Sequence, residues 1–156
     1  MKKAAKILAF LLIITVPALA QNQKTGKMEK RIINHWQWQD QRSYVQAVEV
    51  KNVTSTLYIS GQTAINDDGI SSDADMKTQL IKALENLEKV IAKAGYEPKG
   101  IVRLNIYTTS TAELWPHFNI FQEWVSKHGL KQALTLLEVK SLFETLKVEL
   151  EATVVK

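Results

Sequence analysis

The residues best suited to bind a ligand without adding charge are Ser60, Gly61 and Gln62, which directly follow an apolar, strand-like run. A hydroxyl, a bare backbone and an amide in succession are unusual in a strand that enters a core. Gly61 allows another group to approach the main chain closely, and Ser60 can donate or accept a hydrogen bond. The segment either lines a cleft or forms a bend or bulge in which Ser60 satisfies local backbone groups. Taken alone, these residues favour the bend.

Other common chemistries lack the residues that they need. The chain has no cysteine, which excludes disulfides, a thiol nucleophile and thiolate metal sites. Its three histidines, His35, His117 and His128, do not have the spacing of metal ligands. No glycine-rich phosphate-binding motif is present. We therefore expect neither a metal nor a cofactor.

The elements that must position Ser60 to Gln62 follow from periodicity. Three short strands are expected at 32–41, 44–50 and 57–64, and their consecutive order along the chain favours an antiparallel meander. Apolar residues then recur every three or four positions from 76 to 94, which predicts an amphipathic helix. Ser72 or Asp73 is expected to cap this helix, and Gly95 to end it.

A strand at 101–107, a second helix and two more strands at 133–142 and 146–155 complete the pattern. The second helix begins with a capping box, STAE at 110–113, and Gly129 is its expected end. The order β-β-β-α-β-α-β-β predicts one α+β domain, with two helices on one face of a six-stranded sheet.

The uncovered face of that sheet predicts self-association. We expect it to carry Tyr107, Leu134 and Leu136, together with either Val148 and Leu150 or the two alternating glutamates of the last strand. Apolar residues on a bare sheet face are usually covered by another copy of the chain. A homo-oligomer is therefore expected.

The N-terminus has the pattern of a secretory signal peptide. Three lysines precede a ten-residue, predominantly apolar run, and a proline and Ala-Leu-Ala follow, up to position 20. The run is too short for a membrane span, which needs about 20 apolar residues. We expect residues 1–20 to be cleaved, 21–31 to form a polar leader and 32–156 to form the domain, with export to the periplasm or outside the cell and no membrane attachment afterwards. Loss of three lysines lowers the formal charge from +4 to +1, so no nucleic-acid partner is expected.

Several short motifs together resemble the RidA/YjgF family. They are YVQ at 44–46, ISGQ at 59–62, AG at 94–95, IVR at 101–103, LEV at 137–139 and KVELEA at 147–152. The resemblance implies a chorismate-mutase-like fold, a homotrimer and ligand clefts between subunits. It also favours the cleft interpretation of Ser60, Gly61 and Gln62, with Tyr44 reaching in near them.

The resemblance also points to a missing residue. Deaminases of the family hold the substrate carboxylate with an arginine, and here that position is Leu134, followed by Thr135 and by Leu136 in place of a frequent cysteine. Glu149 matches the carboxylate that positions the attacking water in those deaminases, and is the candidate catalytic residue. Arg103 is the candidate for a relocated cation.

Two functions follow from this pattern. One is an exported protein that binds a small metabolite in the clefts without the family's deamination. The alternative is an enamine or imine deaminase, producing a keto acid and ammonia, that uses Glu149 and a relocated cation such as Arg103. RNA cleavage is less well supported, because the chain has no clustered Arg/Lys face.

Overall fold

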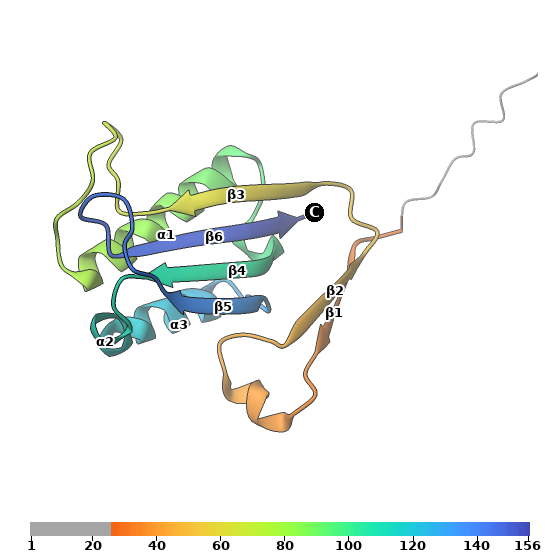
Figure 1. The fold of residues 1–156 in the computed structure, drawn as a ribbon. Coiled ribbons are helices and arrows are strands. Elements are labelled where there is room, and N and C mark those ends of the chain that lie inside the picture. The colour runs from red at the N-terminus through yellow and green to blue at the C-terminus, as the bar shows by residue number, and fades with distance from the viewer. Residues whose placement is uncertain (1–25) are drawn as a thin grey trace, which may run out of the picture.

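The computed structural model describes residues 26–156, and the expected signal peptide and the first part of the leader lie outside the described residues. The strands are β1 Glu29–Ile33, β2 Ala47–Lys51, β3 Thr56–Gln62, β4 Ile101–Thr108, β5 Ala133–Glu138 and β6 Val148–Val155. The helices are α1 Met76–Lys93, α2 Thr111–Leu114 and α3 Phe118–Lys127. The α+β class and two helical segments on one side of the sheet are as predicted (Figure 1).

The described strands form two sheets instead of the single six-stranded sheet that we expected. β3, β6, β4 and β5 form a four-stranded sheet in that order, and β1 and β2 form a separate antiparallel hairpin (Figure 1). The expected meander of the first three strands is therefore wrong, because β3 pairs with the C-terminal β6. β1 also begins at Glu29, inside the expected leader, and residues 37–41 form a 3₁₀ helix where a strand was expected.

The topology explains why both helices cover the same face. β3 and β4 are each antiparallel to β6, so they run parallel to each other, and β5 is parallel to β4. Parallel strands need a crossover connection, which is usually helical. α1 makes the first crossover, and α2 with α3 makes the second (Figure 1).

The core lies between these helices and the four-stranded sheet. α1 contributes a buried stripe whose period matches the sequence pattern, and alternate residues of β4 and β6 face it. Large core side chains with almost no exposed surface include Leu80, Leu87, Ile91, Leu104, Ile106 and Leu150, together with Phe121 of α3. Burial of a large apolar side chain stabilises the fold by about 1.5–3 kcal/mol.

Helix ends agree only partly with the sequence pattern. Asp75, and not Ser72 or Asp73, caps α1, because its carboxylate accepts a hydrogen bond from the Thr78 amide at 2.8 Å. Ser110 caps α2 as expected by accepting from the Glu113 amide at 3.2 Å. The second helix is interrupted by a 3₁₀ turn at Trp115–His117, where Pro116 cannot donate a backbone hydrogen bond.

A polar contact also links the two long helices. Glu88 on α1 accepts hydrogen bonds from the Trp124 indole and from the His128 ring, both at the C-terminal end of α3. Partial burial alone would raise the pKa of Glu88, but these hydrogen bonds outweigh it, and the pKa lies below its ordinary value. The carboxylate is therefore held in its ionised form.

Candidate functional site

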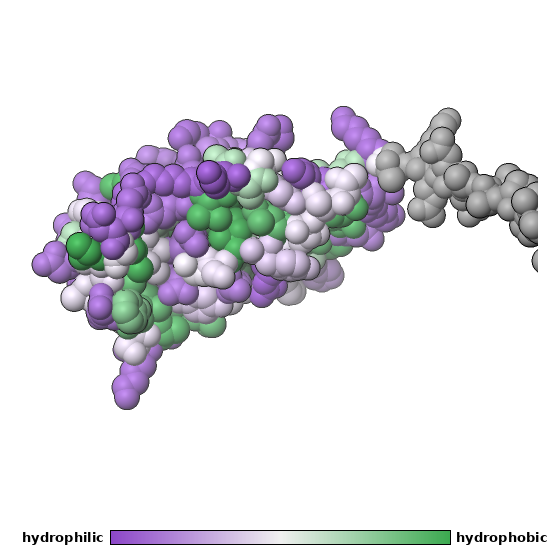
Figure 2. Space-filling view, turned by 90° about the horizontal axis from the view of Figure 1, so that it is seen from above, coloured by the Kyte–Doolittle hydropathy of each residue, from purple (hydrophilic) through white to green (hydrophobic). Residues whose placement is uncertain are grey.

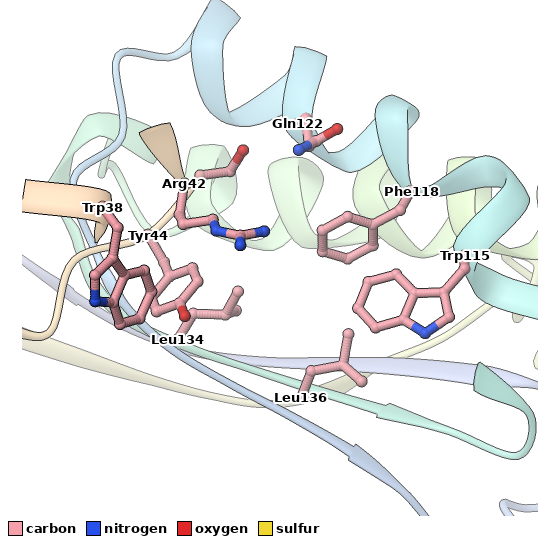
Figure 3. Close-up of a pocket in the computed structure, with 9 residues that line it drawn as sticks. Trp38, Arg42, Tyr44, Trp115, Phe118, Gln122, Leu134 and Leu136 are labelled. Atoms are coloured by element: carbon pink, nitrogen blue, oxygen red, sulfur yellow. The ribbon is translucent and has the colours of Figure 1, made fainter. Parts of the chain in front are cut away.

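A pocket of about 540 Å³ lies where β5 meets α3 and the segment before β2, and we call it the edge pocket. Small-molecule sites commonly measure about 300–1,000 Å³. Aromatic and leucine side chains form most of its wall (Figure 3). Its lining residues are Trp38, Arg42, Ser43, Tyr44, Trp115, Phe118, Gln122, Leu134 and Leu136.

The segment that carries Arg42 and Tyr44 is fixed to the start of β5. The Val45 amide donates to the Gln132 carbonyl at 2.9 Å, and the buried Gln132 side chain donates to the Ser43 carbonyl at 2.8 Å. Alternate residues of an extended segment share a face. Arg42 and Tyr44 both line the pocket, and the Arg42 guanidinium extends into it toward Phe118 (Figure 3).

The opposite wall is aromatic because of the break between α2 and α3. The 3₁₀ turn presents Trp115, which is 55% exposed, and α3 begins with Phe118. Their rings meet edge to face, with centroids 4.8 Å apart. Such pairs add about 0.5–1.5 kcal/mol beyond their burial, so this wall is well defined.

The floor of the pocket is the helix-facing side of β5. Leu134 is paired with Leu104 and Leu136 with Ile106, and both leucines pack against the core. The expectation that they lie with Tyr107 on the uncovered face is wrong, because Tyr107 is paired with Leu137. Adjacent residues of a strand point to opposite faces, so a shift of one residue in the pairing moves a side chain to the other face.

Three further predicted site residues, Thr135, Arg103 and Glu149, lie on the uncovered face. Thr135 is paired with Asn105, and Arg103 and Glu149 alternate with buried residues of β4 and β6. Arg103 is therefore on the opposite side of the sheet from Leu134. Within one protomer it cannot replace a guanidinium at the Leu134 position.

Gly61 and Glu149 form a second group of predicted site residues. Ser60 and Gly61 make a β-bulge, since they lie between Ile59, paired with Ala152, and Gln62, paired with Leu150. A Cβ atom at Gly61 would overlap the carboxyl group of Glu149. Gly61 thus makes room for a carboxylate of its own chain, and the Gln62 side-chain amide donates to the Ser60 backbone carbonyl at 3.0 Å. The bulge expected from the residues alone is present.

A hydrogen-bonded group lies beside Glu149 on the same face. Glu151 accepts from the Asn105 amide at 3.1 Å and from the Tyr107 hydroxyl at 2.9 Å. These two hydrogen bonds, helped by the charge of Arg103, lower the pKa of Glu151. The hydrogen bond to Glu151 in turn raises the pKa of Tyr107, so the phenol stays neutral. The uncovered face is consequently more polar than expected.

Two further properties concern the described residues only. Residues 26–156 contain no cluster of three or more acidic or histidine side chains that could hold a metal ion. None of the helices in this part of the chain has the length and apolar character required to cross a bilayer.

The pocket and fold define an α+β protein with a small-molecule-sized site beside a sheet edge. Comparison with known proteins gives the family. Residues 38–156 match the family described as endoribonuclease L-PSP. The chain belongs to this family, which is the RidA/YjgF family that its motifs indicate.

The alignments with known relatives extend over most of the domain. A RutC family protein of Aquifex aeolicus is 31% identical over 113 residues, covering 72% of this chain and 88% of the relative. The 2-iminobutanoate/2-iminopropanoate deaminase of Escherichia coli is 25% identical over 114 residues, covering 72% and 87%. The crystal structure of YyfB, a Rid family protein of unknown function from Yersinia pestis, superimposes with a TM-score of 0.71 at 29% identity, covering 81% of this chain and 98% of that one.

Sequence reasoning missed several residues of the edge pocket, above all Arg42, Trp38 and Trp115. Arg42 precedes Tyr44 by two positions, so an extended segment there would have placed both on one face. No comparable signal existed for Trp115, which depends on the break in the second helix.

Proposed function

We propose that this protein binds a small metabolite in the edge pocket and has little or no 2-imino acid deaminase activity of the RidA type. One observation supports this most strongly: leucines 134 and 136 form the β5 wall, where the family resemblance expects an arginine and a polar residue. Loss of one partner from a buried charged pair weakens binding by about 2–5 kcal/mol, or about 30-fold to several thousand-fold. Leucine cannot imitate a bidentate guanidinium.

We also propose that the protein works as a homotrimer. The edge pocket and Glu149 lie on opposite faces of one sheet, so a single protomer cannot bring both to one ligand. A neighbouring copy could supply the Gly61–Glu149 face to the pocket, as the resemblance implies. The molecular surface carries a hydrophobic patch bordered by hydrophilic residues, of the kind that association covers (Figure 2). Sedimentation velocity of the purified protein tests the trimer.

Export remains part of this proposal and rests on the pattern of residues 1–20. The mass of the protein recovered from the periplasmic fraction or the medium tests it. A mature chain that begins at Gln21 is expected. Recovery of the uncleaved chain in the cytoplasm would exclude export.

The test of activity is the decay of a 2-imino acid generated by an amino-acid oxidase. The natural protein is expected to leave the decay rate at the buffer value, and Leu134→Arg is expected to accelerate it. Leu134→Met, which keeps the size and adds no charge, is the matched control. Addition of Glu149→Gln to the Leu134→Arg variant should remove the gain.

A second function is kept because a deaminase is among the relatives. In that case the natural protein itself accelerates imine decay, and Glu149→Gln abolishes the effect. The position of Arg103 on the other face of the sheet argues against it as the relocated cation within a protomer. Acceleration by the natural protein would nevertheless replace the binding proposal with this one.

A further inference from the structure

The edge pocket contains a guanidinium group, but this group does not come from β5. Arg42 projects into the pocket from the segment before β2, toward Phe118 (Figure 3). Among the lining residues it is the one charged side chain. The Arg42 guanidinium forms no hydrogen bond or ion pair with another residue in the described part of the chain.

The position of Arg42 is well supported by the backbone. Gln132, fully buried, donates to the carbonyl of Ser43, the residue next to Arg42. The Val45 amide and the isolated bridge between Val45 and Ala133 attach the same segment to β5. The main chain of Arg42 is therefore held at the mouth of the pocket, and the side chain alone has freedom to adjust to a ligand.

The walls around Arg42 select the rest of the ligand. Trp115, Phe118 and Leu136 offer flat or branched apolar surface, and Trp38 adds a second indole that is 52% exposed. Aromatic walls favour a flat apolar group in stacked or edge-to-face contact. A guanidinium that pairs with no carboxylate of the described residues favours an anion, and its planar fork matches a carboxylate.

We infer that Arg42 is the specificity-determining cation of the edge pocket, and that the ligand is a carboxylate bearing an aromatic or other bulky apolar group. This inference rests on the proposed binding function and names its ligand class. Arg42 lies on the segment before β2 and Leu134 on β5, so the cation of this pocket comes from a different element than the arginine that the family resemblance expects.

Binding of 3-phenylpropanoate to the purified protein tests the inference, with 3-phenylpropanamide as the uncharged probe and butanoate as the small one. Calorimetry gives the dissociation constants, and quenching of the intrinsic tryptophan fluorescence, to which the pocket residues Trp38 and Trp115 contribute, gives a second measurement. The carboxylate should bind at least about 10-fold more tightly than the amide, and also more tightly than butanoate. Arg42→Gln should remove the preference for the carboxylate, and Arg42→Lys should restore only part of it.

Arg31→Gln is the matched control, because it removes the same charge from the exposed hairpin strand β1, where Arg31 pairs with Glu49 and does not line the edge pocket. This variant should keep the full preference. The inference is wrong if the natural protein does not bind 3-phenylpropanoate, or if Arg42→Gln keeps the preference. It is also wrong if Arg42→Gln changes only the oligomeric state, because Arg42 would then be a subunit contact.

These outcomes are independent of the activity test. A natural protein that accelerates imine decay refutes the proposed function, whatever the carboxylate preference. A protein that is inactive toward imines but lacks the preference refutes only the role of Arg42.

Discussion

The contact between Gly61 and Glu149 allows a direct test of why the bulge carries a glycine. The Gly61 backbone is not in the left-handed region, unlike Gly69, Gly95 and Gly129, so its conformation is open to alanine. A methyl group there would instead overlap the Glu149 carboxyl group. We therefore expect Gly61→Ala to destabilise the protein by displacing a side chain, with no need for backbone strain.

The size of the effect follows from the freedom of Glu149. Extra methyl groups in packed sites typically destabilise by about 1–3 kcal/mol. Because Glu149 is half-buried and can rotate away, we expect the low end, about 1 kcal/mol. For a domain of this size that lowers the melting temperature by about 3–4 °C. Glu149→Ala alone should change stability by about 0.5 kcal/mol or less.

Thermal unfolding of the two single variants and of the double variant, all at one protein concentration, measures the coupling. In the Glu149→Ala background, Gly61→Ala should no longer destabilise. Ser60→Ala, at the neighbouring exposed position of the bulge, is the control and should have little effect. An equal loss of stability from Gly61→Ala in both backgrounds would show that the bulge itself requires glycine, and the reasoning would be refuted.

Three further predictions concern stability. Gln79→Leu should destabilise the protein by about 3 kcal/mol in chemical unfolding. The buried Gln79 side-chain nitrogen lies 3.0–3.1 Å from three loop carbonyls, and its side-chain oxygen accepts a hydrogen bond from the Lys147 backbone amide. A loss under about 1 kcal/mol would contradict this prediction. Burial raises the pKa of Glu88, but the hydrogen bonds from α3 lower it by more, so the net pKa lies below the ordinary value. The ionised Glu88 therefore stabilises the fold at neutral pH, and this contribution disappears as the pH falls below the ordinary carboxyl range. The difference in stability between the natural protein and Glu88→Gln, about 1 kcal/mol at pH 7 after allowance for solvent screening, should shrink as the pH falls through the lowered pKa of Glu88 and vanish below it, and a constant difference would argue against ionisation. Asp75→Ala should reduce stability by about 1 kcal/mol, while Asp73→Ala should not.

The parts of the fold that local patterns determine were predicted well. The stripe from 76 to 94 gave α1 almost to the residue, because its period depends only on neighbouring turns. The cap was misplaced by two or three residues, since several polar side chains precede the helix and only Asp75 reaches the free amide.

Strand pairing and strand faces were predicted less well, because they depend on distant parts of the chain. Alternation in β5 shows that Leu134 and Leu136 share a face, but the register with β4 decides which face that is. The spacing of Arg42 and Tyr44 indicates that both can share a face, but the contact of their segment with β5 depends on Gln132, which is distant in the sequence. The family resemblance indicated Tyr44, Gly61 and Glu149 as candidate site residues. It did not indicate Arg42, because its motifs include no cation at that position.

The place of β6 in the sheet has a consequence for biogenesis. This last strand of the chain lies between β3 and β4, so neither of those strands has its central partner until synthesis ends. Pairings between such distant segments form late, because the loop between them must close first. The nascent polypeptide therefore cannot complete its four-stranded sheet until its final residues have been synthesised.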